Sequence, residues 1–337
     1  MSCLTNTRHL AGVCICALLL CACATPPQTR ALLADLPAGL PAAIELTDTP
    51  FYPQARYQCG PAALATVLAA NDIAVTLEEL VAAVYVPALQ GSLPEEITAT
   101  ARRYGMLAYR LQPSLENLLM ELAHGNPVLV FQNLGTGLLP RWHFAVVIGY
   151  ELTSRDVILR SGTTRRWRTT LATFERTWSR SDHWALVAVP AGEIPASAQV
   201  TPYLQAAHDL ERTGQLLPAR AAYQAATRQW PEEPRTWLAL GNNLYAASDY
   251  APAANAFRQA TVLAPGDPQG WNNLAYALLQ TACPEQARLA AACAAHIAAD
   301  NPNYRATVEE INTLAQGHDG VHCPAIICGQ NTHPVPP

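Results

Sequence analysis

The sequence predicts an α+β domain followed by an all-α solenoid, and three observations carry this prediction. Helical apolar segments fill the stretch from residue 46 to about 125, and short β-branched runs replace them up to about 190. From about residue 200 on, similar helical segments recur at a fixed interval. Of the 337 residues 50% are hydrophobic and only 14% are charged, which provides apolar material for two cores.

The segment 1–23 has the pattern of an export signal. Arg8 and His9 precede an apolar run over residues 10–20, which is shorter than the roughly 20 residues that span a bilayer as a helix. The segment then ends in Leu-Cys-Ala-Cys, which resembles the lipobox of bacterial lipoproteins. The resemblance implies cleavage before Cys23, acylation of that residue and an anchor without a membrane span. Because Ala24 follows, it also implies an outer-membrane protein that faces the periplasm. An ordinary signal peptide cut at a small residue is the alternative.

Residues 24–45 are rich in proline and small residues, a composition typical of a tether. The domain that follows, residues 46–192, opens with helical patterns. Thr76 and Glu79 form the pattern of a capping box at one of them. The predicted helices span residues 59–70, 77–84, 94–104 and 115–124, and the predicted strands span residues 127–131, 143–150, 157–160 and 184–189.

The second half of the chain repeats itself with a constant period. Pro234, Pro268 and Pro302 stand at equal spacing, with 268 − 234 = 34 and 302 − 268 = 34. The aromatic residues that recur at the same interval are Tyr203, Trp237 and Trp271. An aromatic residue, a leucine and small residues at this period resemble the tetratricopeptide repeat, which folds as two antiparallel helices. We expect three repeats and a capping helix within residues 200–316, followed by an irregular tail over residues 317–337.

Stacked repeats of this kind present a concave surface on which a protein or peptide partner commonly binds. Four asparagines on the first helices of the predicted repeats are candidates for contacts with an extended chain. They are Asn242, Asn243, Asn272 and Asn273. A solvated polar face without a partner is the alternative interpretation.

Four cysteines near the C-terminus are candidates for disulfides in an oxidising compartment. Cys323 and Cys328 form a local pair, whereas Cys283 and Cys293, if they lie on one helix, stand about 15 Å apart. None of these cysteines has the histidine and cysteine spacing of a zinc site. The sequence therefore predicts no metal, and no cofactor is expected. The formal net charge of −5 gives no basic footprint, so the sequence predicts no nucleic-acid partner.

Cys59 opens an apolar helix in the segment Tyr-Gln-Cys-Gly-Pro-Ala-Ala-Leu. The unpaired N–H groups and the dipole at a helix N-terminus favour a thiolate. A cysteine nucleophile also needs a base, a group that orients the base, and donors for the oxyanion. His143 opens a hydrophobic strand and is the preferred base, with His183 as the alternative. Gln54 and the backbone N–H of Cys59 are the candidate oxyanion donors, and an inert buried cysteine is the competing interpretation.

These residues resemble the C39 and C39-like cysteine peptidases, a papain-related group, over about residues 48–190. The resemblance implies a papain-like fold with Cys59 as nucleophile, His143 as base and Gln54 as the oxyanion glutamine. The family's aspartate that orients the histidine is missing, and Ser161 stands in its place. Asp156 is a poor substitute because the hairpin would place it more than about 20 Å from His143. Ser161 or a nearby backbone carbonyl is therefore the expected orienting group.

The sequence thus leads to two functions from different classes. The preferred one is a membrane-anchored, periplasm-facing cysteine peptidase that cleaves amide bonds and carries a repeat module for a protein or peptide partner. The alternative is a weak or inactive peptidase-like scaffold that binds peptides. A cell-wall hydrolase of the NlpC/P60 type is less favoured, because Gly-Pro-Ala follows Cys59 where Ser-Gly is expected.

Overall fold

The computed structural model describes residues 25–315, 323 and 325–328. The chain divides into two compact units: the first contains the residues up to Ile97 and Arg110–Val187, and the second contains Thr98–Tyr109 and the residues from Ala188 onward. The sequence pattern placed the border between the domains near residue 192. It did not predict that Thr98–Tyr109, although within the first half of the sequence, belongs to the second unit. The predicted export signal with Cys23, and most of the predicted tail, lie outside the described residues. Within the described residues, no helix combines the length and apolar character needed to cross a membrane.

The segment predicted as a tether folds in large part onto the first unit. Helix α2 (Pro27–Ala34) starts where the carboxylate of Glu175 accepts hydrogen bonds from the N–H groups of Gln28 and Thr29, at 2.9 and 2.6 Å. These are first-turn N–H groups that have no partner within their own helix. Strand β1 (Ala43–Glu45) then pairs antiparallel with β4 (Trp142–Glu151). The expectation of a free tether over residues 24–45 is therefore wrong from α2 on.

Strand β1 pairs closely with β4 because Gly149 has no side chain. A Cβ at Gly149 would stand 2.3 Å from the carbonyl oxygen of Ile44. The register of β4 with its other neighbour, β5 (Asp156–Ser161), also shifts between Val147 and Gly149. Glycine is therefore required where the strand is bulged and a second backbone approaches it.

The four predicted helices of the first half are confirmed, with bounds that agree to a single position at each end. They are α3 (Cys59–Ala69), α4 (Leu77–Val84), α5 (Pro94–Arg103) and α6 (Leu115–Ala123). The capping box of Thr76 and Glu79 is formed as predicted. Helix α3 is buried along almost its whole length and packs against β4. Its Ala-rich sequence allows this close approach because the side chains are small.

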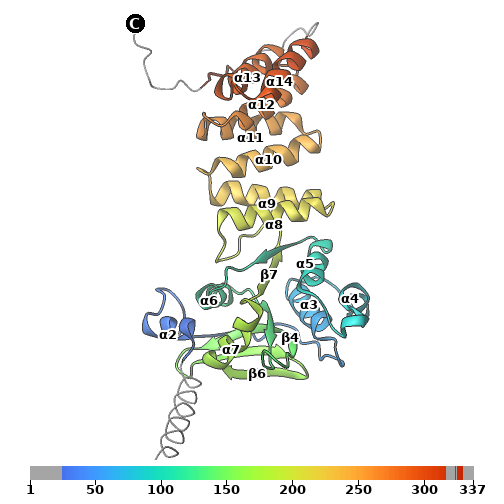
Figure 1. Ribbon diagram of the computed structural model, residues 1–337, viewed down its shortest axis with the longest axis vertical. Helices are drawn as coiled ribbons and strands as arrows, with labels where there is room; N and C mark the ends of the chain where they lie inside the picture. The colour runs from blue at the N-terminus through green and yellow to red at the C-terminus, as the bar shows by residue number, and fades with distance from the viewer. Residues whose placement is uncertain (1–24, 316–322, 324, 329–337) are drawn as a thin grey trace, which may run out of the picture. The chain divides into compact units, whose positions relative to one another are not determined.

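The β-sheet has the strand order β2-β7-β3-β4-β5-β6, and β1 lies beside β4. The remaining strands are β2 (Met106–Arg110), β3 (Val128–Asn133), β6 (Thr164–Thr170) and β7 (Ala185–Pro190), and two further helical segments are α7 (Leu171–Trp178) and η2 (Ser179–Ser181). The pairs from β3 to β6 and the pair of β3 with β7 are antiparallel. An antiparallel sheet with helices packed on it is the papain-like arrangement that the sequence predicted (Figure 1).

The second unit is helical from residue 200 onward and repeats itself (Figure 1). Its helices are α8 (Val200–Arg212), α9 (Leu216–Gln229), α10 (Pro234–Ala246), α11 (Tyr250–Leu263), α12 (Pro268–Gln280), α13 (Pro284–Ile297) and α14 (Pro302–Leu314). The starts of α8, α10, α12 and α14 recur at the period that the sequence predicted, since 234 − 200, 268 − 234 and 302 − 268 are equal. One contact recurs at this interval: the indoles of Trp237 and Trp271 donate to the carbonyl oxygens of Pro231 and Pro265, at 2.8 and 2.9 Å. The all-α prediction is confirmed, and three helical pairs precede α14.

The disulfides differ from both pairs considered from the sequence. Cys283 is bonded to Cys323 and Cys293 to Cys328, with Cα atoms 5.8 and 5.7 Å apart. Cys283 directly precedes α13 and Cys293 lies on that helix, so these two cysteines are too far apart to bond each other. Each bonds a cysteine of the C-terminal segment instead. The sequence separations of 40 and 35 residues make these long-range pairs that local spacing does not predict.

Candidate active site

Cys59 is the first residue of α3 and stands half-buried where that helix meets β4. The backbone N–H groups of Phe144, Gly60 and Cys59 itself lie close enough to its sulfur to lower the pKa of the thiol. Phe144 is the residue directly after His143 on β4. The fold therefore brings the helix start and the strand start together, although Cys59 and His143 are far apart in the sequence.

The protonation state of the thiol differs from the prediction. Burial raises the pKa of Cys59 above its ordinary value, and the backbone N–H groups of Phe144 and Gly60 oppose this effect without overcoming it. The helix start favours a thiolate as expected, but the loss of solvent around the sulfur is the larger effect. At neutral pH the resting side chain is therefore a thiol.

His143 is the second residue of β4, and its Nε2 lies 2.9 Å from the Oγ of Ser161 at the end of β5. With Nε2 engaged by Ser161, Nδ1 is the ring nitrogen left to exchange a proton with a reacting group. Burial and then the positive charge of Arg141 lower the pKa of His143 to about 4. The imidazole is therefore neutral at pH 7 and able to accept a proton.

The two alternative residues lie elsewhere. Asp156 pairs with Glu151 at the far end of the hairpin, as expected, and forms an ion pair with Arg168 at 2.9 Å. His183 packs its ring edge-on against Trp178, with ring centroids 4.8 Å apart, and is absent from the residues that line the cleft described below. Neither residue is placed to replace Ser161 or His143.

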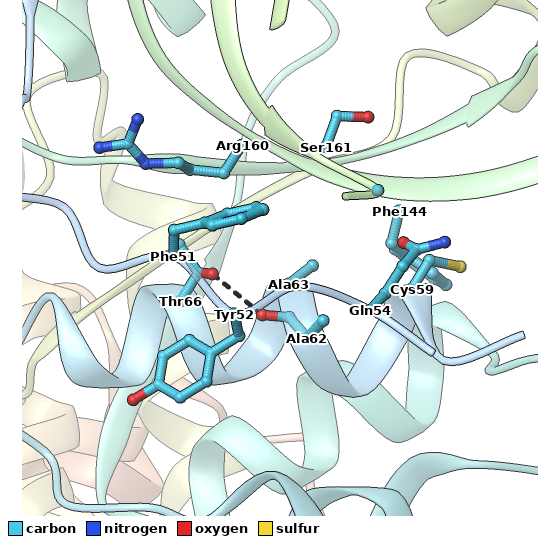
Figure 2. A pocket seen from close by; sticks show the side chains of 11 residues that line it. Phe51, Tyr52, Gln54, Cys59, Ala62, Ala63, Thr66, Phe144, Arg160 and Ser161 are labelled. Carbon is cyan, nitrogen blue, oxygen red and sulfur yellow. Dashed lines mark hydrogen bonds between the residues drawn. The ribbon is translucent and has the colours of Figure 1, made fainter. Parts of the chain in front are cut away.

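Gln54 lies in the loop before α3, and its backbone N–H donates to the carbonyl oxygen of Gly162 at 3.2 Å. Gly162 directly follows Ser161 and has a φ of 62°, a conformation that glycine adopts without strain. Gln54, Cys59 and Ser161 line one small recess, and Figure 2 shows these three side chains around it. The hydrogen bond to Gly162 thus ties the proposed oxyanion residue to the turn that carries Ser161.

A larger cleft of about 750 Å³ opens on the same thiol. Gln54, Cys59 and His143 all line it, so the structure brings these three predicted residues to one cavity. The segments 89–94 and 140–144 also line this cleft, together with Phe131. A volume of this size is in the range of ordinary ligand sites, which span roughly 300–1,000 Å³.

Sequence reasoning missed several residues of this cleft. Arg141 and Trp142 line the cleft and directly precede His143, the predicted base. Their position next to the base in the sequence could have identified them as cleft residues. Ser92 gave no signal, because a loop serine far from Cys59 in the sequence has no distinctive pattern. Its Oγ is buried without a hydrogen-bond partner, and a Cβ on Gly60 would stand 2.4 Å from it. Ser92 therefore packs directly against the first turn of α3.

A metal ion has no evident place among these residues. Across the described ranges, no group of three or more His, Cys, Asp or Glu side chains is arranged to hold one. The candidate chemistry is that of a thiol, an imidazole, an amide and a hydroxyl.

The comparisons with known proteins agree with this interpretation for the first part of the chain. Residues 46–185 match the model of the Peptidase_C39 like family. The matched stretch contains Gln54, Cys59, His143 and Ser161. No curated protein matches this chain.

Several solved structures are similar to part of the chain. A putative C39-like peptidase from Bacillus anthracis is 19% identical, with a TM-score of 0.36, and the match covers 44% of this chain and 97% of that one. A double glycine motif protease from an AMS/PCAT transporter, in complex with its leader peptide, is 22% identical, with a TM-score of 0.32 and coverages of 42% and 91%. The Yersinia enterocolitica type III secretion chaperone SycD, in complex with a peptide of the translocator YopD, is 19% identical, with a TM-score of 0.31 and coverages of 34% and 87%.

Proposed function

We propose that the first unit is a cysteine peptidase that works from a neutral thiol and a neutral imidazole. The observation that carries the proposal is the shared cleft, in which Cys59 at the start of α3 and His143 at the start of β4 are joined by Gln54. A nucleophile, a base and an amide donor around one cavity are the parts that acyl transfer requires.

In the proposed reaction, Sγ of Cys59 attacks the carbonyl carbon of a peptide bond while Nδ1 of His143 takes the thiol proton. The oxygen of the tetrahedral intermediate receives hydrogen bonds from the backbone N–H of Cys59 and the side-chain amide of Gln54. Collapse breaks the C–N bond, and the imidazolium returns its proton to the leaving amine. A water molecule that His143 deprotonates then hydrolyses the thioester and restores the thiol.

Ser161 orients the imidazole in this reaction. When His143 carries the proton, its Nε2–H donates to the Oγ of Ser161, which lies 2.9 Å away. A hydroxyl stabilises an imidazolium less than a carboxylate does. We therefore expect His143 to become protonated only while the thiol attacks the substrate. The low pKa of His143 agrees with a base that is neutral before the substrate arrives.

We also propose that Cys23 is lipidated and that the domain faces the periplasm from the outer membrane. The two disulfides support this location, since such bonds persist in oxidising compartments. Because α2 starts at Pro27 and is anchored by Glu175, only residues 24–26 would separate the lipid from the folded unit. That spacing is at most about 14 Å, so the peptidase would act close to the membrane surface.

The helical unit is proposed to be a tetratricopeptide module for a protein or peptide partner. Asn273 donates to Asn242 at 2.8 Å, and both line a recess of about 180 Å³ with Tyr245 and Tyr276. The hydroxyl of Tyr276 donates to Glu310 at 2.7 Å. Amide and phenol groups at the edge of an apolar recess suit an extended peptide, which offers both backbone polar groups and side chains.

The peptidase proposal is tested with a protein digest as a general substrate mixture. The chain from residue 24 on is incubated with the peptides of a cell lysate cut by a protease of known specificity, and new peptide termini are identified by mass spectrometry. We expect new termini with the native protein and none with Cys59→Ala or His143→Ala. A folded native protein that produces no new terminus would refute the proposal and leave the peptide-binding scaffold.

A further inference from the structure

We propose that the cleft selects a peptide that carries a large apolar side chain next to an acidic residue. This inference rests on the proposed peptidase function and names the substrate class of the same site. Three features of the cleft support it: an aromatic wall, an exposed apolar rim, and an unpaired positive charge.

The aromatic wall is stacked and partly open to solvent. The ring of Phe131 stacks on that of Trp142, with centroids 5.0 Å apart and planes at 16°, and on that of Phe144, at 4.4 Å and 28°. All three rings belong to residues that line the cleft. Trp142 remains 50% exposed, so its face is available beside His143. Stacked rings lose little freedom on binding, which makes them effective contacts for an apolar side chain.

Further apolar residues of the cleft are exposed as well. Leu89 is 57% exposed, Leu93 41% and Tyr57 36%, and all three line the cleft. A large apolar side chain that contacts these residues and Trp142 would remove apolar surface of both from water. A pair of glycines in the same place would leave both surfaces uncovered, so the cleft is better suited to a bulky residue.

The charge of the cleft is positive. Among the described residues that line it there is no aspartate or glutamate, whereas Arg141 lies beside the base. Arg141 makes no ion pair and no side-chain hydrogen bond within the described part of the chain. Because its charge disfavours protonation of His143, a substrate carboxylate near Arg141 would offset this effect while His143 holds the proton. A peptide with an acidic residue is therefore complementary in charge and also favours the reaction.

The test measures binding separately from cleavage. Fluorescent hexapeptides with Gly, Leu or Phe at one central position and Gln or Glu at the other, in both orders, are titrated into the Cys59→Ala protein. We expect the peptides with Phe and Glu to bind at least tenfold more tightly than those with Gly and Gln. We expect Trp142→Ala to abolish the preference for Phe, and Arg141→Gln the preference for Glu.

Two matched variants serve as controls. Trp167 is 51% exposed but lies on β6 outside the cleft, and Arg212 is exposed on α8, so Trp167→Ala and Arg212→Gln are expected to leave both preferences unchanged. Equal affinity for all peptides, or no binding, would overturn the inference. Selective binding without cleavage by the native protein would refute the peptidase and keep the ligand class. Cleavage of all peptides at similar rates would keep the peptidase and refute the ligand class.

Discussion

The Nε2 atom of His143 on β4 and the Oγ atom of Ser161 at the end of β5 lie 2.9 Å apart, on two strands that pair with each other. The hydroxyl keeps the ring in place without a negative charge beside it. His143 remains neutral at physiological pH because burial, and then the positive charge of Arg141, lower its pKa to about 4, and burial also keeps the thiol of Cys59 neutral.

Replacing Ser161 tests its role as the orienting group. Ser161→Ala is expected to lower kcat about tenfold, because one hydrogen bond contributes roughly 1–1.5 kcal/mol, while KM stays nearly unchanged. Ser161→Asp should raise the pKa of His143 and move the acid limb of the pH–rate profile to higher pH. The control is Ser154→Ala, since Ser154 lies in the same hairpin but bonds Arg168. Full activity of Ser161→Ala with an unchanged profile would show that another group orients the ring.

The stability of the first unit should fall in mild acid because of His143. Its pKa in the folded protein is about 4, below the value of about 6.5 in an unfolded chain. Above pH 6.5 both states hold a neutral ring, whereas between pH 6.5 and 4 the unfolded state binds the proton first. The contribution of His143 is therefore complete above pH 6.5, and up to about 3 kcal/mol is lost by pH 4.

Urea unfolding at pH 7 and pH 4.5 measures this effect. In His143→Gln, the free energy of unfolding should differ less between pH 7 and pH 4.5 than it does in the native protein. His124 is exposed, so His124→Gln is the matched control. An equal loss of stability in the native protein and in His143→Gln would contradict the depressed pKa.

The thiol of Cys59 should react slowly with a small alkylating reagent at neutral pH. Because burial raises its pKa, the midpoint of the rate against pH is expected above the roughly 8.5 of a free thiol. The four other described cysteines are in disulfides and do not compete. Labelling by iodoacetamide, located by peptide mapping in the chain from residue 24 on, gives the midpoint. A value below 7 would show a preformed thiolate and refute the neutral pair.

Gly60 should be indispensable for the geometry of the site. A Cβ there would stand 2.4 Å from Oγ of Ser92, so Gly60→Ala must move either the loop or the start of α3. We expect a loss of roughly 1–3 kcal/mol in stability and a clear loss of activity. Adding Ser92→Gly should restore much of both, and Gly192→Ala, where no atom lies within 4 Å, should cost little. A Gly60→Ala protein as stable and active as the native one would contradict the packing.

Local patterns predicted much of this molecule. The helix at Cys59, the strand at His143 and the constant interval of the helical repeats each depend on residues close in sequence, and all three appear in the structure. Strand pairing rules alone predicted Asp156 beside Glu151, as the structure has it, and Ser161 at the end of the hairpin that carries His143. Those rules are local because a short turn fixes the register.

The features that the sequence did not predict depend on distant residues. Glu175 holds the start of α2 across 146 and 147 residues, and no composition rule connects the two segments. Strand β6 was missed because its central residues Arg165, Arg166 and Arg168 are charged and exposed, unlike those of a typical strand. The protonation state of Cys59 was misjudged because the helix dipole is visible in the sequence, whereas burial requires the fold.

The most direct measurement asks whether Cys59 becomes acylated. The native protein is mixed with the peptide digest, quenched in acid within seconds, and the peptide that contains Cys59 is examined by mass spectrometry. We expect a thioester on Cys59 that hydroxylamine removes, in an amount that falls strongly in His143→Ala. A folded protein whose Cys59 stays unmodified while new peptide termini accumulate would contradict covalent catalysis by this thiol, and absence of both would contradict the peptidase itself.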